Sequence, residues 1–164
     1  MADTTYPPIA ITQGASEAQG LVQAREVYFV ETASETHTGA IAVPAGAWIT
    51  DIIVQAEALW TAATSASLEV GDGDDPDGFY TAVDLKATDL IVSGGKQTIS
   101  FATTGGVEGA YLVGSATHWT GLYNASARTI TATIAKVGSG TAGRTRMIVV
   151  YVTPSTSTLA TSVA

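Results

Sequence analysis

Four aspartates crowd into a short, tightly turned segment where they could bind a cation, contact another protein or form a solvated turn. They are Asp72, Asp74, Asp75 and Asp77. An EF-hand loop starting at Asp72 needs an oxygen ligand at its fifth position and glutamate at its twelfth, where this chain has proline and valine. The spacing therefore excludes an EF-hand. An irregular calcium site formed by these four aspartates stays open, because calcium accepts flexible oxygen geometries.

The same segment has the sequence of a type I β-turn. Asp75 fits the first position, Pro76 fixes φ at the second and Gly78 fits the fourth. Leu68 and Val70 precede it with the alternation of a half-buried strand. We therefore expect a tight turn that leaves a strand, and its acidity serves solvation, a subunit contact or the irregular cation site.

A glycine-rich segment comes within one residue of a phosphate-binding loop. It reads GSGTAGRT over residues 138–145, with Arg144 where such a loop has lysine. A phosphate loop leads into a helix whose free N–H groups hold the anion, whereas the sequence that follows, RTRMIVVYV, is typical of a strand. The segment therefore predicts a glycine-rich hairpin loop. Arg144 and Arg146 then share one strand face, either solvated or forming a small basic contact.

Catalytic and cofactor-binding groups are not recognisable in this sequence. His37 and His118 lack the paired spacing of a zinc site and the neighbours of a nucleophile and base. We expect a non-enzymatic protein without a cofactor. Aromatic residues could form a carbohydrate-stacking platform, but their irregular spacing is more typical of core or interface anchors. These residues are Trp48, Trp60, Trp119, Tyr80 and Tyr123.

Strand signals recur along the chain, and no segment shows a long helical repeat. The clearest strand covers residues 128–137, where Ile130, Ala132 and Ile134 alternate with threonines. At most a short helix near residues 82–90 interrupts the pattern. This organisation predicts an all-β, single-domain antiparallel β-sandwich or jelly roll. The other expected strands are residues 25–31, 39–43, 47–58, 67–70, 97–101, 110–113 and 144–153.

The two ends differ from the body in composition. The expected body covers residues 25–153, between an extended N-terminal arm of residues 1–24 and a flexible C-terminal tail of residues 154–164. Both ends lack the alternation of a strand and consist mainly of small and polar residues. A terminal arm of this kind can become ordered against a neighbouring subunit.

Composition limits the partners of the chain. A net charge of −8 with only seven Lys and Arg argues against nucleic-acid binding. No signal segment and no run of roughly 18 apolar residues indicates export or membrane insertion. Charged residues make up only 13% of the chain and the mean hydropathy is +0.25. Self-association or a protein partner is therefore favoured.

Residues 41–92 combine an alternating strand with a series of short motifs. They contain PAGAWITDIIVQAEALW followed by SLEVGDGDDPDGFYTAVDLKATDL, that is, the strand, then V-G-D, the acidic D-P-D-G-F turn and T-A-x-D-L. This pattern resembles small structural proteins of tailed bacteriophages. The chain looks like a phage head decoration, or cement, protein. No residue-level contact motif accompanies this resemblance.

The resemblance implies a β-rich virion structural protein on the outer capsid surface, made in the host cytoplasm. Such proteins often form trimers and bridge neighbouring major capsid subunits, so the implied partners are the major capsid lattice and further copies of this chain. The alternative function is a carbohydrate- or receptor-binding virion module, such as a fibre or tail component, that uses exposed aromatic residues.

Overall fold

The protein is folded almost entirely into antiparallel β-strands. The computed structural model describes residues 22–87, 91–92, 95–96, 98–101, 106–113 and 121–153. Ten strands lie within these ranges: β1 (Val22–Val30), β2 (Thr36–Val43), β3 (Trp48–Ala58), β4 (Ser65–Gly71), β5 (Tyr80–Asp84), β6 (Ile91–Val92), β7 (Gly95–Lys96), β8 (Thr98–Ile99), β9 (Arg128–Val137) and β10 (Arg144–Val152).

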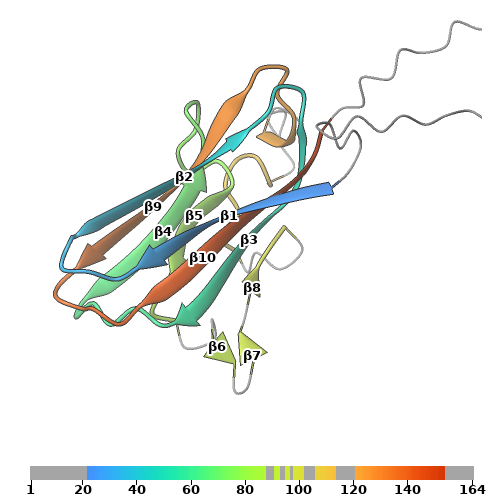
Figure 1. Ribbon diagram of the computed structural model, residues 1–164. Coiled ribbons are helices and arrows are strands. Elements are labelled where there is room, and N and C mark those ends of the chain that lie inside the picture. The colour runs from blue at the N-terminus through green and yellow to red at the C-terminus, as the bar shows by residue number, and fades with distance from the viewer. Residues whose placement is uncertain are drawn as a thin grey trace, which may run out of the picture.

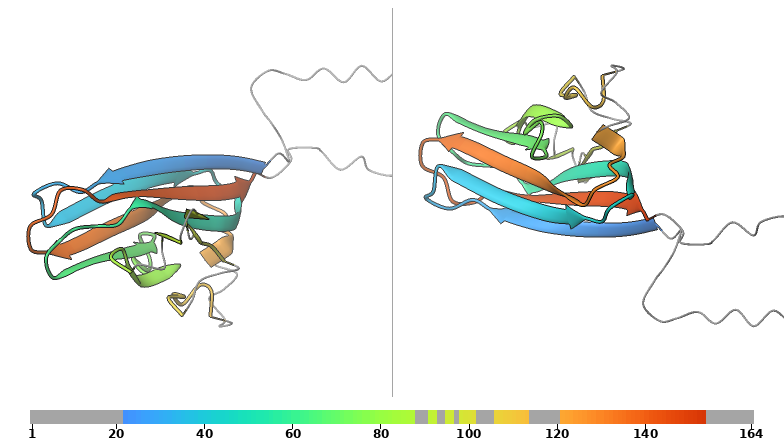
Figure 2. Two further views of the ribbon diagram at one scale, coloured as in Figure 1. Left: turned by 90° about the horizontal axis from the view of Figure 1, so that it is seen from below. Right: turned by 90° about the horizontal axis from the view of Figure 1, so that it is seen from above.

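Two four-stranded sheets pack face to face as a sandwich, which confirms the expected fold class (Figures 1 and 2). Sheet A has the order β1-β10-β3-β8, and sheet B has the order β2-β9-β4-β5. The small β6–β7 pair stands apart as a third, two-stranded sheet. Connections between successive strands of the two main sheets cross from one sheet to the other, except for the connection from β4 to β5, which stays in sheet B.

The core lies between the sheets because each long strand turns alternate apolar side chains inward. In β9, Ile130, Ala132 and Ile134 are fully buried, as the alternation with threonine predicts. Met147 and Val149 on β10 face them from the other sheet and are equally buried. Tightly packed inner faces of this kind provide most of the stabilisation through burial of apolar surface.

Gly39 lies in the seam, the edge of the sandwich where β1 of sheet A packs beside β2 of sheet B. A Cβ atom at this β2 position would lie 2.6 Å from Cζ of Phe29 and 2.8 Å from a methyl group of Val27. Both neighbours belong to β1, so the absence of a side chain at Gly39 lets β1 and β2 approach each other closely here.

Two sequence-based predictions of local structure are wrong, and a third is tested only in part. Residues 138–143 do not form a hairpin loop, because β9 and β10 belong to different sheets and this segment crosses between them. Residues 110–113 form a turn, in which the amides of Leu112 and Val113 donate to the carbonyl of Gly109 at 3.0 and 3.3 Å. In the range where at most a short helix was expected, residues 82–84 belong to β5, whose pairing with β4 continues through Asp84, and residues 88–90 lie outside the described residues.

The boundaries of the body can be compared with the sequence only in part. Strand β1 starts at Val22, three residues before the expected strand, and pairs there with Val152 of β10. The two ends of the body therefore leave side by side at one end of the sandwich (Figure 1). Residues 1–21 and the tail of residues 154–164 lie outside the described residues.

Candidate functional site

The acidic segment is a compact loop between β4 and β5. The expected turn at residues 75–78 is confirmed, since the amide of Gly78 donates to the carbonyl of Asp75 at 3.2 Å. The amide of Asp72 donates to the same carbonyl at 2.9 Å. The loop therefore folds back on its own start.

Asp72 turns into the protein, where it organises the loop. Its side chain is almost fully buried, and Oδ1 accepts hydrogen bonds from the amides of Asp74 at 3.0 Å and Asp75 at 3.1 Å. The Tyr111 hydroxyl also donates to Oδ1 at 3.0 Å, and Nη1 of Arg128 lies 3.1 Å from Oδ2. Burial, followed by the Asp72 charge, raises the pKa of Tyr111 above its ordinary value. Two distant segments thus neutralise and hold this carboxylate.

The remaining aspartates point toward solvent. Asp74 is exposed, while Asp75 and Asp77 are partly exposed. Burial raises the pKa of Asp75, and a hydrogen bond with Asp77 raises it further. Among the described residues, which include all four aspartates, no group of three or more acidic, His or Cys side chains is placed to hold a metal ion. The geometry assigns Asp72 to an internal ion pair.

Sequence reasoning missed both partners of Asp72. The inward position of Arg128 could have been predicted from the sequence. Arg128 alternates in phase with the buried residues Ile130 and Ala132, so its side chain lies on the inner face of the strand. Tyr111 gave no such signal. Its position depends on residues 107–111 running beside β5, where the amide of Tyr111 donates to the carbonyl of Gly78 at 2.7 Å.

The glycine-rich loop binds an anion, and that anion is a carboxylate of the same chain. Oε2 of Glu31 accepts hydrogen bonds from the amide and hydroxyl of Thr61, both at 2.8 Å. The amides of Ala142 and Gly143 donate to the same oxygen at 3.1 and 2.9 Å. A Cβ atom at Gly140 would lie 2.3 Å from the other carboxylate oxygen, so the loop closes around Glu31 because this position is glycine. The resemblance to a phosphate loop reflects this internal site.

Glu31 has a buried cationic neighbour. Nζ of Lys136 lies 3.9 Å from Oε1 of Glu31, and the two side chains are 1% and 0% exposed. Burial alone would raise the pKa of Glu31, but the hydrogen bonds from Thr61, Gly143 and Ala142 outweigh it and lower the pKa to about 2. The carboxylate is therefore ionised and ties together three connections at the end of the sandwich opposite Val22.

His37 and Trp60 pack beside this ion pair. Their rings meet edge to face with centroids 5.0 Å apart, and Nε1 of Trp60 donates to the Thr145 hydroxyl at 2.9 Å. Burial lowers the pKa of His37, and the Lys136 charge lowers it further. His37 packs against Trp60 here, and its Nε2 accepts a hydrogen bond from the amide of Thr32 at 3.2 Å.

Among the described residues, only two of the aromatic side chains considered for sugar stacking, Trp48 and Tyr123, come together. Trp60 and Tyr80 are buried in the core, whereas Tyr123 is 43% exposed and lies beside Trp48 with ring centroids 6.0 Å apart. Trp119, like His118 before it, lies outside the described residues.

The outer face of sheet A carries a charged network. Arg144 and Arg146 share this face, as expected, but only Arg144 is exposed. Nη1 of Arg146 lies 3.3 Å from Oε2 of Glu26, and Nη2 lies 3.8 Å from Oε1 of Glu57. Arg146 also lies over the Tyr28 ring, 5.4 Å from its centroid. The charge of Arg146 is thus neutralised by acidic residues of its own sheet.

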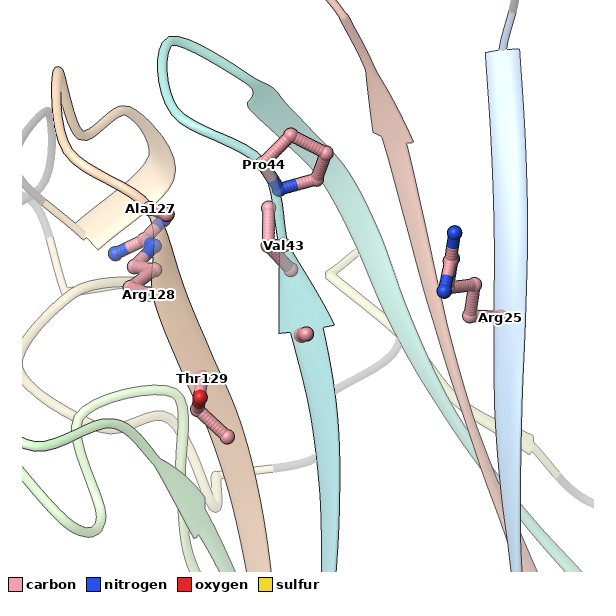
Figure 3. Close-up of a pocket in the computed structure, with 7 residues that line it drawn as sticks. Arg25, Val43, Pro44, Ala127, Arg128 and Thr129 are labelled. Atoms are coloured by element: carbon pink, nitrogen blue, oxygen red, sulfur yellow. The ribbon is translucent and has the colours of Figure 1, made fainter.

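A groove of about 320 Å³ opens between the two sheets near the end where the chain enters and leaves the body. Figure 3 shows Arg25 projecting from β1 on one side and Val43, Pro44 and Arg128 on the other. Nε of Arg25 donates to the hydroxyl of buried Tyr151 at 3.0 Å, which holds the arginine toward the groove. The groove therefore combines an apolar wall with an exposed guanidinium group.

Solved structures of phage capsids contain chains with a similar fold. A chain of the acidic stable capsid structure of Helicobacter pylori bacteriophage KHP30 has a TM-score of 0.53 and 15% identity, covering 84% of this chain and 91% of that chain. This fold occurs in a phage capsid. A chain of the capsid of Ralstonia phage GP4 is also similar, with a TM-score of 0.49 and 14% identity, covering 85% of this chain and 89% of that chain. A chain of the cyanophage Pam1 capsid asymmetric unit has a TM-score of 0.48 and 18% identity, covering 94% of this chain and 100% of that chain.

The likeness to the KHP30 chain is one of fold, given its low sequence identity. No protein-family model and no curated protein sequence matches the chain. Within the described residues, no helix is both long and apolar enough to cross a membrane.

Proposed function

We propose that this chain is a non-enzymatic structural protein of a phage virion, which decorates the outer capsid surface and stabilises it by bridging major capsid subunits. The observation that carries the proposal is the fold shared with a phage capsid chain over most of both chains. The orders β1-β10-β3-β8 and β2-β9-β4-β5 also describe an eight-stranded jelly roll, an architecture used by viral capsid domains. The head-decoration resemblance of residues 41–92 points the same way.

The charged clusters support a structural role over a catalytic one. The Asp72–Arg128 and Glu31–Lys136 pairs are buried and hold loops of the chain itself. A hydrolytic site needs an acid or base that reaches a substrate in a pocket. In the part of the chain that the structure describes, both pairs instead serve the fold.

Decoration stabilises a capsid by mass action. A protein that binds the assembled lattice and not its separate subunits favours the assembled state. Several exposed apolar side chains on an otherwise weakly charged chain suit such contacts, among them Val22 at 66% and Val30 at 52% exposure. A trimer would bind through several equivalent contacts and gain avidity. The proposed location is the virion exterior, after synthesis in the host cytoplasm.

Cosedimentation with expanded, undecorated capsids of the same phage tests the proposal. The chain should sediment with the capsids at a fixed copy number and raise the temperature at which they release DNA or dissociate. A matched sample of unexpanded precursor capsids measures non-specific binding. Failure to bind, or binding without a gain in thermal or chemical resistance, contradicts the proposal.

A carbohydrate- or receptor-binding role in a fibre or tail is the second candidate, and the paired rings of Trp48 and Tyr123 favour it. Binding on a glycan array that is lost in Tyr123→Ala, together with a low copy number in the virion, would select this function over decoration. Tyr28→Ala is the matched control, since Tyr28 is comparably exposed at 46% but lies on the outer face of sheet A.

A further inference from the structure

Two long, regular strand edges lie on the same side of the sandwich. Strands β1 and β2 are the outer strands of sheets A and B, and each pairs with its single neighbour without a register shift. Strand β5 pairs irregularly and β8 has only two residues, so the opposite edges are short or distorted. Within the described residues, no backbone hydrogen bond reaches the outer edges of β1 or β2. Long, regular edges of this kind can accept another extended segment.

The groove opens where these two edges diverge. Phe29 and Gly39 bring β1 and β2 together toward the loop end, whereas Arg25 and Val43 line the open groove toward the other end. A volume of about 320 Å³ has room for a few side chains of an inserted segment. The groove can therefore receive a short stretch of chain that runs along a free edge.

Arg25 selects the chemistry of the occupant. It lies on the inner face of β1, and the Tyr151 hydroxyl that accepts from Nε also donates to Oε1 of Gln23 at 3.3 Å. This arrangement positions the rest of the guanidinium group at the groove. An apolar or basic occupant would desolvate this charge without compensation, whereas a carboxylate would pair with it.

The first residues of the chain match these requirements in sequence. Asp3 and Glu17 are the charged side chains of residues 1–21, which contain no Lys or Arg, and apolar residues such as Ile9 and Ile11 lie between them. The segment joins the body at Val22, at the groove end of the sandwich. Fully extended, it reaches about 70 Å, which is far enough to contact a neighbouring copy.

We propose that residues 1–21 of a second copy enter the groove in an extended conformation and place a carboxylate beside Arg25. Val22 lies only three residues from Arg25 on the same strand, so an arm that places Glu17 in its own groove has to reverse direction at once. An arm that continues outward can reach a neighbouring copy instead. Exchange of arms between copies would produce the self-association that the low charge of the chain favours. This inference does not depend on capsid binding.

Disulfide trapping tests the contact in the full chain, which has no cysteine of its own. Ala42→Cys on the groove is combined with Ala18→Cys beside Glu17 in one variant, and with Ala2→Cys beside Asp3 in another. Mild oxidation should yield covalent dimers or larger oligomers with at least one pair, on non-reducing electrophoresis. Replacing the groove cysteine by Ser139→Cys, exposed at the opposite end of the sandwich, should give background only. Disulfides within single chains, or no cross-linking above that control, overturn the proposal.

The role of Arg25 has its own test in the pair that cross-links. Arg25→Gln should slow cross-linking at least about five-fold, whereas Arg144→Gln, which changes an exposed arginine outside the groove, should leave the rate unchanged. Asp3→Asn and Glu17→Gln identify the carboxylate, because one of them should reproduce the Arg25→Gln effect. Circular dichroism confirms that each variant is folded. An unchanged rate in folded Arg25→Gln contradicts the proposed pairing.

Discussion

Replacing Glu31 by glutamine should destabilise the sandwich strongly at neutral pH. Glutamine keeps the size of the side chain and one carbonyl oxygen, but it removes the charge that four hydrogen-bond donors and Lys136 surround. Lys136, at 1% side-chain exposure, is then left as a buried cation without its counter-ion. Breaking a buried pair from one side costs more than removing both partners.

The pKa of Glu31 gives the size of the effect. Its ordinary value of 4.5 falls to about 2 in the folded protein, and each factor of ten in proton affinity corresponds to about 1.4 kcal/mol. The folded state therefore favours the ionised carboxylate by roughly 3 kcal/mol. At this chain length, a loss of that size lowers the melting temperature by about 6 to 12 °C.

The sign of the pH dependence follows from the lowered pKa. The unfolded chain binds the Glu31 proton more readily, so this stabilisation is complete above pH 4.5 and is lost as the pH falls toward about 2. In urea titrations at pH 7, the free energy of unfolding of Glu31→Gln should therefore be about 3 kcal/mol lower than that of wild type, and this difference should shrink below pH 4.5. Glu35→Gln, an exposed change in the same connection, is the matched control and should stay within about 0.5 kcal/mol of wild type.

A double variant separates the ion pair from simple packing. Adding Lys136→Met to Glu31→Gln removes the unpaired cation and should recover part of the lost stability. The electrostatic explanation is refuted if the free energy of unfolding of Glu31→Gln lies within about 0.5 kcal/mol of the wild-type value at pH 7. It is also refuted if the variant stays less stable than wild type by the same amount down to pH 2.

Three further variants test the acidic loop and the seam. Asp72→Asn leaves Arg128 without its buried counter-ion and should lower the free energy of unfolding by about 2 to 4 kcal/mol in urea titrations; a loss below about 0.5 kcal/mol contradicts this. Millimolar calcium should not move the melting temperature of wild type or of Asp74→Asn in scanning calorimetry, since Asp72 is already paired, and a rise of several degrees in wild type alone would reveal an irregular calcium site. Gly39→Ala places a methyl group 2.6 Å from Phe29 and should cost about 1 to 3 kcal/mol by chemical unfolding, so an unchanged midpoint would show that the seam is loosely packed.

Local sequence patterns predicted the long strands well. Alternation placed Ile130 and Ile134 on the buried face of β9, and its predicted bounds agree with the structure. The turn at residues 75–78 was also predictable, because its residue types have direct conformational causes. The pattern failed at residues 110–113, which form a turn that buries Tyr111 and leaves Val113 exposed.

Local sequence patterns could not predict which side chains pair with each other across the sandwich. The sequence by itself determined an all-β chain with an acidic turn and a glycine-rich loop, since strand alternation and turn chemistry act over a few neighbouring residues. Only the tertiary structure decided that Asp72 meets Arg128 and that the glycine-rich loop surrounds Glu31. These residues are far apart along the chain, and the connections that cross between sheets bring them together. Burial then makes each pairing obligatory, because a buried charge without a partner is costly.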